Sequence, residues 1–255
     1  MTELLVPGRF NGPRASGNGG WTAGALAGRL AGVPADHAAP WPPVRVTLRK
    51  PPPLDVPLPV VDGAATDADG EVVAVAEVVD RELEPVAAVD AAAATTASAS
   101  YAGLTHHPFP GCFVCGTARE DGLRIFPGRV GEDAGGRVRV AAPWTPDPSC
   151  AEDWHEYVDD HRRAALAITW AALDCVGGWT SDLEERPLVL GRMTARVDTL
   201  PVVGEPHVVV GGARGSEGRK TNTSSTLYDP DGRVVAVAEH VWIAVDPAAF
   251  NRLRG

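Results

Sequence analysis

The sequence has few basic residues relative to acidic ones, no long hydrophobic run and few cysteines. Lys and Arg total 23 against 33 for Asp and Glu, a net charge of −10, which disfavours binding to nucleic-acid phosphates and anionic membrane surfaces. No apolar stretch reaches the roughly 18 residues that a membrane helix needs, and the N-terminus lacks the pattern of a signal peptide. We therefore expect a cytoplasmic protein with no nucleic-acid or membrane partner.

Four cysteines are too few to stabilise 255 residues by disulfides, and a reducing compartment would keep them as thiols. Cys112 and Cys115, preceded by His106 and His107, have the spacing of half a zinc knuckle. A second Cys-x-x-Cys motif is absent, so four ligands would require both histidines or the distant Cys150. A redox Cys-x-x-Cys normally opens a helix, whereas the flanking glycines predict a turn. We therefore expect a structural loop without metal. If a metal does bind, the candidate ligands are Cys112, Cys115, His106 and His107.

Two segments of the sequence occur twice. Asp67–Glu77 (DADGEVVAVAE) returns as Asp229–Glu239 (DPDGRVVAVAE), and the four residues from Gly19 (GGWT) return from Gly177. The separation is too long for a solenoid repeat, so each copy should be a unit of domain size. Duplicated folds often replace a homodimer, which would place a site at the seam between the copies.

Hydrophobic periodicity predicts a helix followed by antiparallel strands in each copy. In the first copy we expect a helix within 16–30, a strand at 44–50, a turn at Asp69-Gly70 and a strand at 71–79. In the second copy we expect a helix at 162–179 and strands at 188–197, 206–210, 221–228 and 233–245. Part of 81–101 favours a helix, and 123–126 with 137–141 predicts a hairpin that opens the second copy.

This pattern predicts an α+β fold in which one helix packs on a sheet, twice. The interval from Pro57 to Asp67 is shorter than that from Pro206 to Asp229, so the first copy should be abbreviated by about one strand and its turn. We divide the chain into a shortened N-terminal repeat (1–80), a linker with the Cys-x-x-Cys loop (81–122) and a C-terminal repeat (123–255).

The order of these elements resembles that of the double-hotdog acyl-CoA thioesterases of the hotdog superfamily. The resemblance rests on the Gly-Gly segments, the Pro-rich turn after a strand, and the Asp-Gly hairpin before an Ala/Val strand. It implies a tandem hotdog, each copy a central helix wrapped by an antiparallel sheet, with thioester sites between one helix and the neighbouring sheet. It also implies a pseudo-dimer within one chain, compatible with a further homo-oligomer, and no cofactor other than the coenzyme A of a small acyl thioester substrate.

Asp174 is the main catalytic candidate. It lies in an otherwise apolar helical stretch, where a carboxylate is costly to bury unless it has partners or a task. The resemblance implies a catalytic Asp or Glu on this helix, as base or nucleophile. The alternative is a carboxylate that faces solvent or caps the helix. Cys175 points about 100° away around the helix and reads as a small core residue.

Backbone N–H groups at the start of the first helix could polarise a thioester carbonyl. Asn18, Gly19 and Gly20 fit this role, with Trp21 as the floor of an acyl pocket, although a tight turn with close packing explains the glycines equally well. Both interpretations, a thioester-binding helix start and a tight structural turn, stay open.

Other candidates come from the second copy. His240 matches the position where the resembling family carries a polar residue, often Gln, and it could orient water or act as a base. Thr194 is a weaker candidate for orienting the carboxylate. Arg219 and Lys220 could bind the phosphates of coenzyme A, although charged residues in turns are usually only solvated.

These residues predict a thioesterase-like hydrolase acting on acyl-CoA or a related acyl thioester, with water activated by a helix carboxylate at the seam between the repeats. The alternative is a non-catalytic protein that binds acyl groups or coenzyme A and has kept the fold without the chemistry. A hotdog dehydratase is a third interpretation, but no paired spacing of His and Asp in the sequence requires it.

Overall fold

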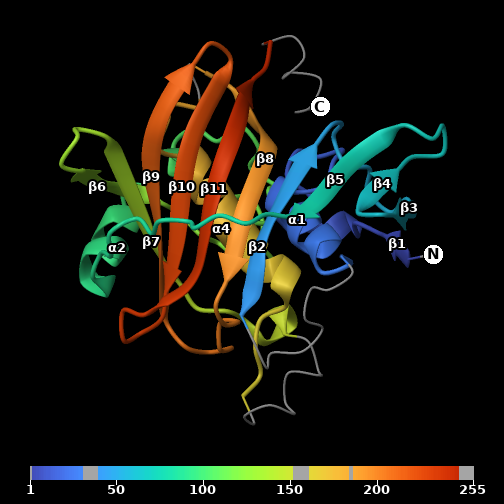
Figure 1. Cartoon of the computed structure of the whole chain (residues 1–255). Helices are drawn as coiled ribbons and strands as arrows, with labels where there is room; N and C mark the ends of the chain where they lie inside the picture. The colour runs from blue at the N-terminus through green and yellow to red at the C-terminus, as the bar shows by residue number, and fades with distance from the viewer. Residues whose placement is uncertain (1, 31–39, 152–160, 184–185, 247–255) are drawn as a thin grey trace.

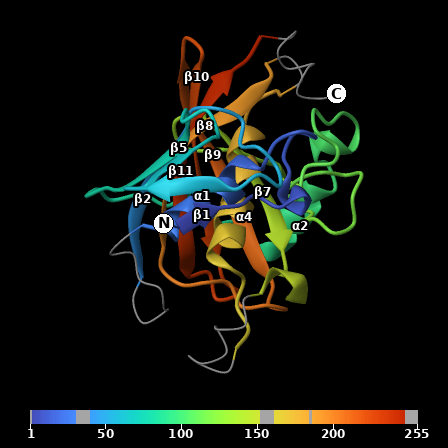
Figure 2. The same cartoon turned by 90° about the vertical axis from the view of Figure 1, so that its right-hand side faces the viewer.

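The computed structural model describes residues 2–30, 40–151, 161–183 and 186–246. Eleven strands from these residues form one antiparallel sheet in the order β1-β3-β4-β5-β2-β8-β11-β10-β9-β7-β6 (Figure 1). Helices α1 and α4 lie together on one face of this sheet (Figure 2). The result is an α+β architecture in which a curved sheet covers a pair of helices.

The strands are β1 (Thr2–Leu4), β2 (Trp41–Leu48), β3 (Leu58–Val61), β4 (Ala64–Thr66), β5 (Val72–Val78), β6 (Gly128–Glu132), β7 (Val138–Trp144), β8 (Leu188–Val197), β9 (His207–Glu217), β10 (Lys220–Tyr228) and β11 (Val234–Ala244). The helices are α1 (Gly19–Ala27), α2 (Ala91–Ser98) and α4 (Leu166–Gly178), with short 3-10 turns η1 (Gly8–Phe10), η2 (Ala102–Leu104) and η3 (Pro148–Cys150).

The middle of the sheet is an antiparallel pair formed by β2 and β8, which joins the strands from the first half of the chain to those from the second half. On its other side β2 pairs with β5, and β8 pairs with β11. The turns before β5 and β11 have the same hydrogen bonds. Oδ1 of Asp67 accepts from the backbone N–H groups two and four residues later at 3.1 and 2.9 Å, and Oδ1 of Asp229 does so at 2.9 and 2.8 Å. The longer sequence repeat is therefore also a repeat of local structure.

Three details of the sequence prediction are wrong. The first half does not lack a strand, because β3 and β4 are both present with 4 and 3 residues, against 11 and 9 in β9 and β10. The residues 123–126 form no strand, and the hairpin of this region is β6 with β7. The two Gly-Gly segments are not equivalent, since Gly19 begins α1 whereas Gly178 ends α4.

The main hydrophobic core lies between the helices and the sheet, and it includes Trp170 of α4, Met193 of β8 and Phe113 of the Cys-x-x-Cys loop. A smaller cluster covers the other face, where the segment 79–90 crosses the sheet toward α2 (Figure 1). There the backbone N–H of Val86 donates to Oγ1 of Thr226 at 2.8 Å. In the part of the chain that the structure describes, the helices are too short or too polar to cross a membrane.

Candidate active site

Two glycines of α1 let this helix pack closely against α4, with the two helices antiparallel. Gly20 of α1 lies against Asp174 of α4, and Gly24 lies against Trp170, one turn earlier in α4. A Cβ atom on Gly20 would lie 2.5 Å from the Cβ of Asp174, and one on Gly24 would lie 2.6 Å from the Cβ of Trp170. Larger side chains are thus excluded at both positions. The contact places the N-terminus of α1 beside the C-terminal half of α4.

Asp174 is buried at this junction, with one of its two oxygens hydrogen-bonded. Oδ2 accepts from the backbone N–H of Gly20 at 2.9 Å and from Nδ2 of Asn18 at 3.0 Å. Asn18 is also the N-cap of α1, because its Oδ1 accepts from the backbone N–H of Trp21 at 2.8 Å. Oδ1 of Asp174 has no hydrogen-bond partner among the described residues. The carboxyl group is therefore held by one oxygen, while the other is buried without a hydrogen bond from the described residues.

The environment of Asp174 favours its protonated form. Burial removes the water that would solvate a carboxylate and raises the pKa of Asp174 to about 7. The hydrogen bonds from Gly20 and Asn18 act against this increase, and negative charge on Cys112 adds to it. Both protonation states are accordingly populated at neutral pH.

The Cys-x-x-Cys loop meets α4 beside this carboxyl group. The Sγ atoms of Cys112, Cys115 and Cys175 all lie within 4.8 Å of one another, and those of Cys112 and Cys175 are 3.8 Å apart. Hydrogen bonds from the Cys115 and Cys175 thiols hold the pKa of Cys112 well below its usual value. Cys150 is buried elsewhere and is not part of this group.

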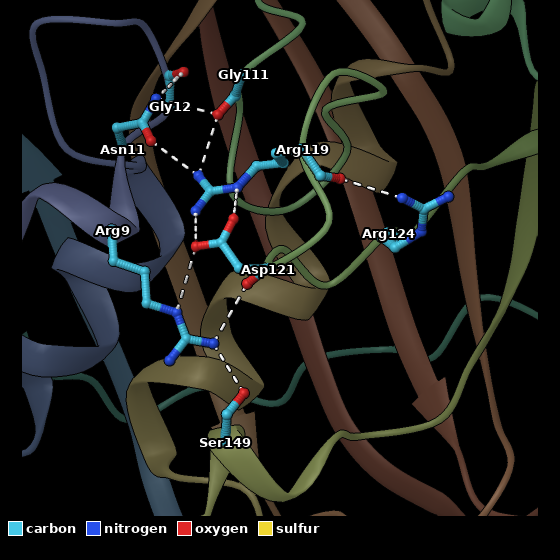
Figure 3. Close-up of polar contacts among 8 residues, drawn as sticks. All are labelled: Arg9, Asn11, Gly12, Gly111, Arg119, Asp121, Arg124 and Ser149. Carbon is cyan, nitrogen blue, oxygen red and sulfur yellow. Dashed lines mark hydrogen bonds and ion pairs between the residues drawn. The ribbon is translucent and has the colours of Figure 1, made fainter.

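An ion-pair network fixes the loop to the N-terminal segment (Figure 3). Nε and Nη2 of Arg119 donate to the two carboxylate oxygens of Asp121 at 2.8 and 2.7 Å, and Nη1 donates to Oδ1 of Asn11 at 2.9 Å. Arg9 extends the network, since its Nη2 donates to Oγ of Ser149 at 2.8 Å and to the backbone carbonyl of Asp121 at 3.2 Å. Such bidentate pairs fix geometry as well as charge. The position of the loop therefore does not depend on the cysteines alone.

A cavity of about 370 Å³ opens onto Asp174 and the three thiols. This volume is within the range of sites for small molecules. Most of the wall is apolar. The polar part includes Asn18, Gly19, Arg49, Lys50, His107, Asp174 and the three cysteines Cys112, Cys115 and Cys175, and the apolar part includes Leu48, Phe109, Trp179, Leu190, Trp242 and Ile243.

The two other catalytic candidates, His240 and Thr194, do not line this cavity. His240 faces α4 from β11, where its Nδ1 lies 3.2 Å from Oγ1 of Thr223, and burial lowers the pKa of His240 to about 4. Thr194 is paired opposite Glu239, and both line a polar hollow on the other face of the sheet. Thr194 therefore cannot orient Asp174.

The substrate-binding candidates are divided. Asn18 and Gly19 line the cavity and Gly20 binds the carboxylate, whereas Trp21 stacks on Phe10 with ring centroids 4.3 Å apart and is not part of the wall. Arg219 and Lys220 lie at the hairpin between β9 and β10, outside the cavity wall.

The two histidines near the loop differ in position. His106 is exposed, whereas His107 lines the cavity. Nδ1 of His107 accepts from the backbone N–H of Phe109 at 2.9 Å, so its Nε2 is the donor to the carbonyl of Cys115, also at 2.9 Å. His107 is thus engaged with the backbone of the loop.

Sequence reasoning missed three groups that line the cavity. Cys175 packs against the main core, as expected, and its thiol also faces Cys112 in the cavity wall. Arg49 and Lys50, directly after the strand β2, also line the cavity. Their position just before the Pro-rich turn was visible in the sequence, although nothing there indicated that this turn borders Asp174.

No model of a known protein family matches the sequence, and no curated protein matches it. Solved structures do match. A conserved protein of unknown function with a hot dog fold from Alicyclobacillus acidocaldarius is 13% identical, with a TM-score of 0.54 over 96% of this chain and 93% of that one. The tesB protein of Mycobacterium avium subspecies paratuberculosis is 14% identical, with a TM-score of 0.54 over 95% of this chain and 91% of that one. The chain therefore has the hotdog fold, as the sequence predicted.

Proposed function

We propose that this protein is a double hotdog and that it hydrolyses thioesters of acyl groups with coenzyme A or a related carrier. The strand order supports the first part. From the central pair outward, β2-β5-β4-β3-β1 on one side corresponds to β8-β11-β10-β9-β7 on the other, with α1 before β2 and α4 before β8. The two hotdog units would then be joined side by side through β2 and β8.

One observation carries the enzymatic proposal: the buried carboxyl group of Asp174 in the wall of an apolar cavity. A carboxylate is costly to bury, and here one oxygen is held by Gly20 and Asn18 while Oδ1 has no partner among the described residues. An acyl chain would suit the apolar wall, with its reactive carbon next to that free oxygen.

In the proposed reaction, Oδ1 of Asp174 accepts a proton from water as the water oxygen attacks the thioester carbon. The bond from carbon to sulfur then breaks, and the leaving thiolate takes the proton back from Asp174, which gives a free acid and a free thiol and restores the carboxylate. Gly19 lines the cavity at the positive end of α1, and we assign its backbone N–H to the carbonyl oxygen. In this reaction α1 provides the N–H group that binds the carbonyl oxygen, and α4 provides the carboxylate that activates water.

Cations near the cavity could bind the phosphates of coenzyme A. Arg49 is exposed and lines the cavity together with Lys50, whose Nζ is 2.8 Å from Oδ2 of Asp67. Lys220 is paired across the strands with Ile243, which lines the same cavity, and Arg219 precedes it. We assign the phosphates to these cations, with Arg49 the first of them to test.

The test is a panel of acyl-CoA esters from acetyl to palmitoyl, with free coenzyme A and free acid quantified by chromatography, which avoids reagents that modify the cysteines. Asp174→Asn keeps the size of the side chain and removes the base, so we expect turnover to fall at least about 100-fold. Asp231→Asn, at an exposed turn, is the matched control and should keep the wild-type rate.

Absence of turnover on every ester, or equal rates for the wild type and Asp174→Asn, would contradict the proposal. If the esters instead raise the melting temperature without being consumed, the protein binds acyl groups without hydrolysing them. Far-UV circular dichroism of each variant separates loss of chemistry from loss of fold.

A further inference from the structure

Three thiols converge beside the cavity from two distant parts of the chain. Cys112 and Cys115 come from the loop after η2, and Cys175 comes from α4. Their sulfur atoms lie within 4.8 Å of one another, and all three residues are free thiols that line the cavity. Cys150, also buried and free, lies outside the group. The hydrolytic chemistry proposed above uses none of these thiols.

The distance between the sulfurs of Cys112 and Cys175 fits two ligands of a single thiophilic metal ion. Zn–S bonds are about 2.3 Å long, so two thiolates at adjacent corners of a zinc tetrahedron lie about 3.8 Å apart. The Sγ atoms of Cys112 and Cys175 are 3.8 Å apart. A disulfide would need about 2.05 Å, a much shorter distance. Thiolate ligands select zinc, copper(I) or iron–sulfur clusters over hard cations.

The groups around the sulfurs hold the loop in a shape that can bind a metal. The backbone N–H of Gly116 donates to the carbonyl of Cys112 at 2.9 Å, and a Cβ on Gly116 would lie 2.4 Å from that oxygen. Nε2 of His107 and the hydroxyl of Tyr101 both donate to the carbonyl of Cys115, at 2.9 and 3.2 Å. Such outer hydrogen bonds orient ligands before the metal binds.

We infer that Cys112, Cys115 and Cys175 form a zinc site with three thiolate ligands, whose fourth position is open to the cavity. Three protein ligands with one exchangeable position are typical of zinc sites that bind a further molecule, whereas structural sites use four. Each thiol that becomes a ligand releases its proton on binding. The inference does not depend on the proposed hydrolysis.

The experiment measures zinc in protein produced in a medium that also contains iron and copper. We expect about one zinc per chain in the wild type and in Cys150→Ser, and at least a tenfold lower content in Cys112→Ser and Cys175→Ser. Addition of zinc to chelator-treated protein should raise the melting temperature of the wild type and Cys150→Ser only, since a ligand of the folded state stabilises it by mass action.

A second measurement uses the wild type alone, which keeps the test valid if a variant fails to fold. Cobalt added to the chelator-treated protein should give intense visible bands of tetrahedral geometry and a near-ultraviolet band from thiolate to cobalt charge transfer. Zinc should abolish both. No stoichiometric metal, copper or iron in place of zinc, equal zinc in all four proteins, or a disulfide between Cys112 and Cys175 in protein without zinc would overturn the inference.

Discussion

The buried imidazole of His240 should make this protein less stable as the pH falls below about 6.5. The side chain is 2% exposed, and its pKa falls from 6.5 to about 4 because burial disfavours the charged ring. Between these two values the unfolded chain binds more protons than the folded one, so stability is lost as the pH falls. The loss is about 2 kcal/mol at pH 5 and about 3 kcal/mol below pH 4, since one pKa unit corresponds to about 1.4 kcal/mol.

His240→Asn removes this titration and keeps a polar group near Nδ1, which lies 3.2 Å from Oγ1 of Thr223. Urea denaturation of both proteins at pH 8.0, 6.5 and 5.0 gives the free energies of unfolding. Other groups titrate equally in both, so the difference between the proteins should shift by about 2 kcal/mol in favour of the variant from pH 8.0 to 5.0. A difference that stays constant over this range would show that His240 is not held neutral by burial.

Two further predictions concern the helix contact and the repeated turn. Gly20→Ala should lower the free energy of unfolding by about 1–3 kcal/mol, because the new methyl group would lie 2.5 Å from the Cβ of Asp174. Urea denaturation checks this against Gly28→Ala, whose methyl would meet its nearest neighbour only at 3.3 Å, and equal losses would speak against the packing argument. Asp67→Ala and Asp229→Ala should each lower the free energy of unfolding, because each carboxylate accepts two backbone N–H groups. A thermal or urea melt that shows a loss in only one of them would contradict the equivalence of the turns.

Periodicity and turn residues were enough to predict most of the strands. β8 spans the residues expected for it, and β5 and β11 follow the two Asp-Gly turns. The shortened strands β3 and β4 were missed, because segments of 4 and 3 residues carry too little alternation to recognise. The Gly-Gly repeat misled for a different reason, since glycine suits both the start and the end of a helix.

Some residues of the candidate site were predictable one by one, but their arrangement was not. An acidic residue in an apolar helix indicated Asp174, and a polar residue before two glycines indicated Asn18. Their contact joins residues 156 positions apart and depends on the close packing of α1 on α4, which no local pattern reveals. Thr194 could have been placed correctly, because it alternates with the buried Met193 and therefore faces the other side of β8.

The two ends of the α1–α4 pair are chemically unlike. At one end Asn18 and Gly20 bind the carboxyl group of Asp174, whereas at the other Gly28 meets the aliphatic side chain of Leu166. A symmetric pair of identical chains would present the same groups at both ends and accept two equivalents of a small molecule. Among the residues that the structure describes, this polar anchor lies at the first end and not at the second, so calorimetric titration with a molecule that recognises it should saturate at a stoichiometry of one.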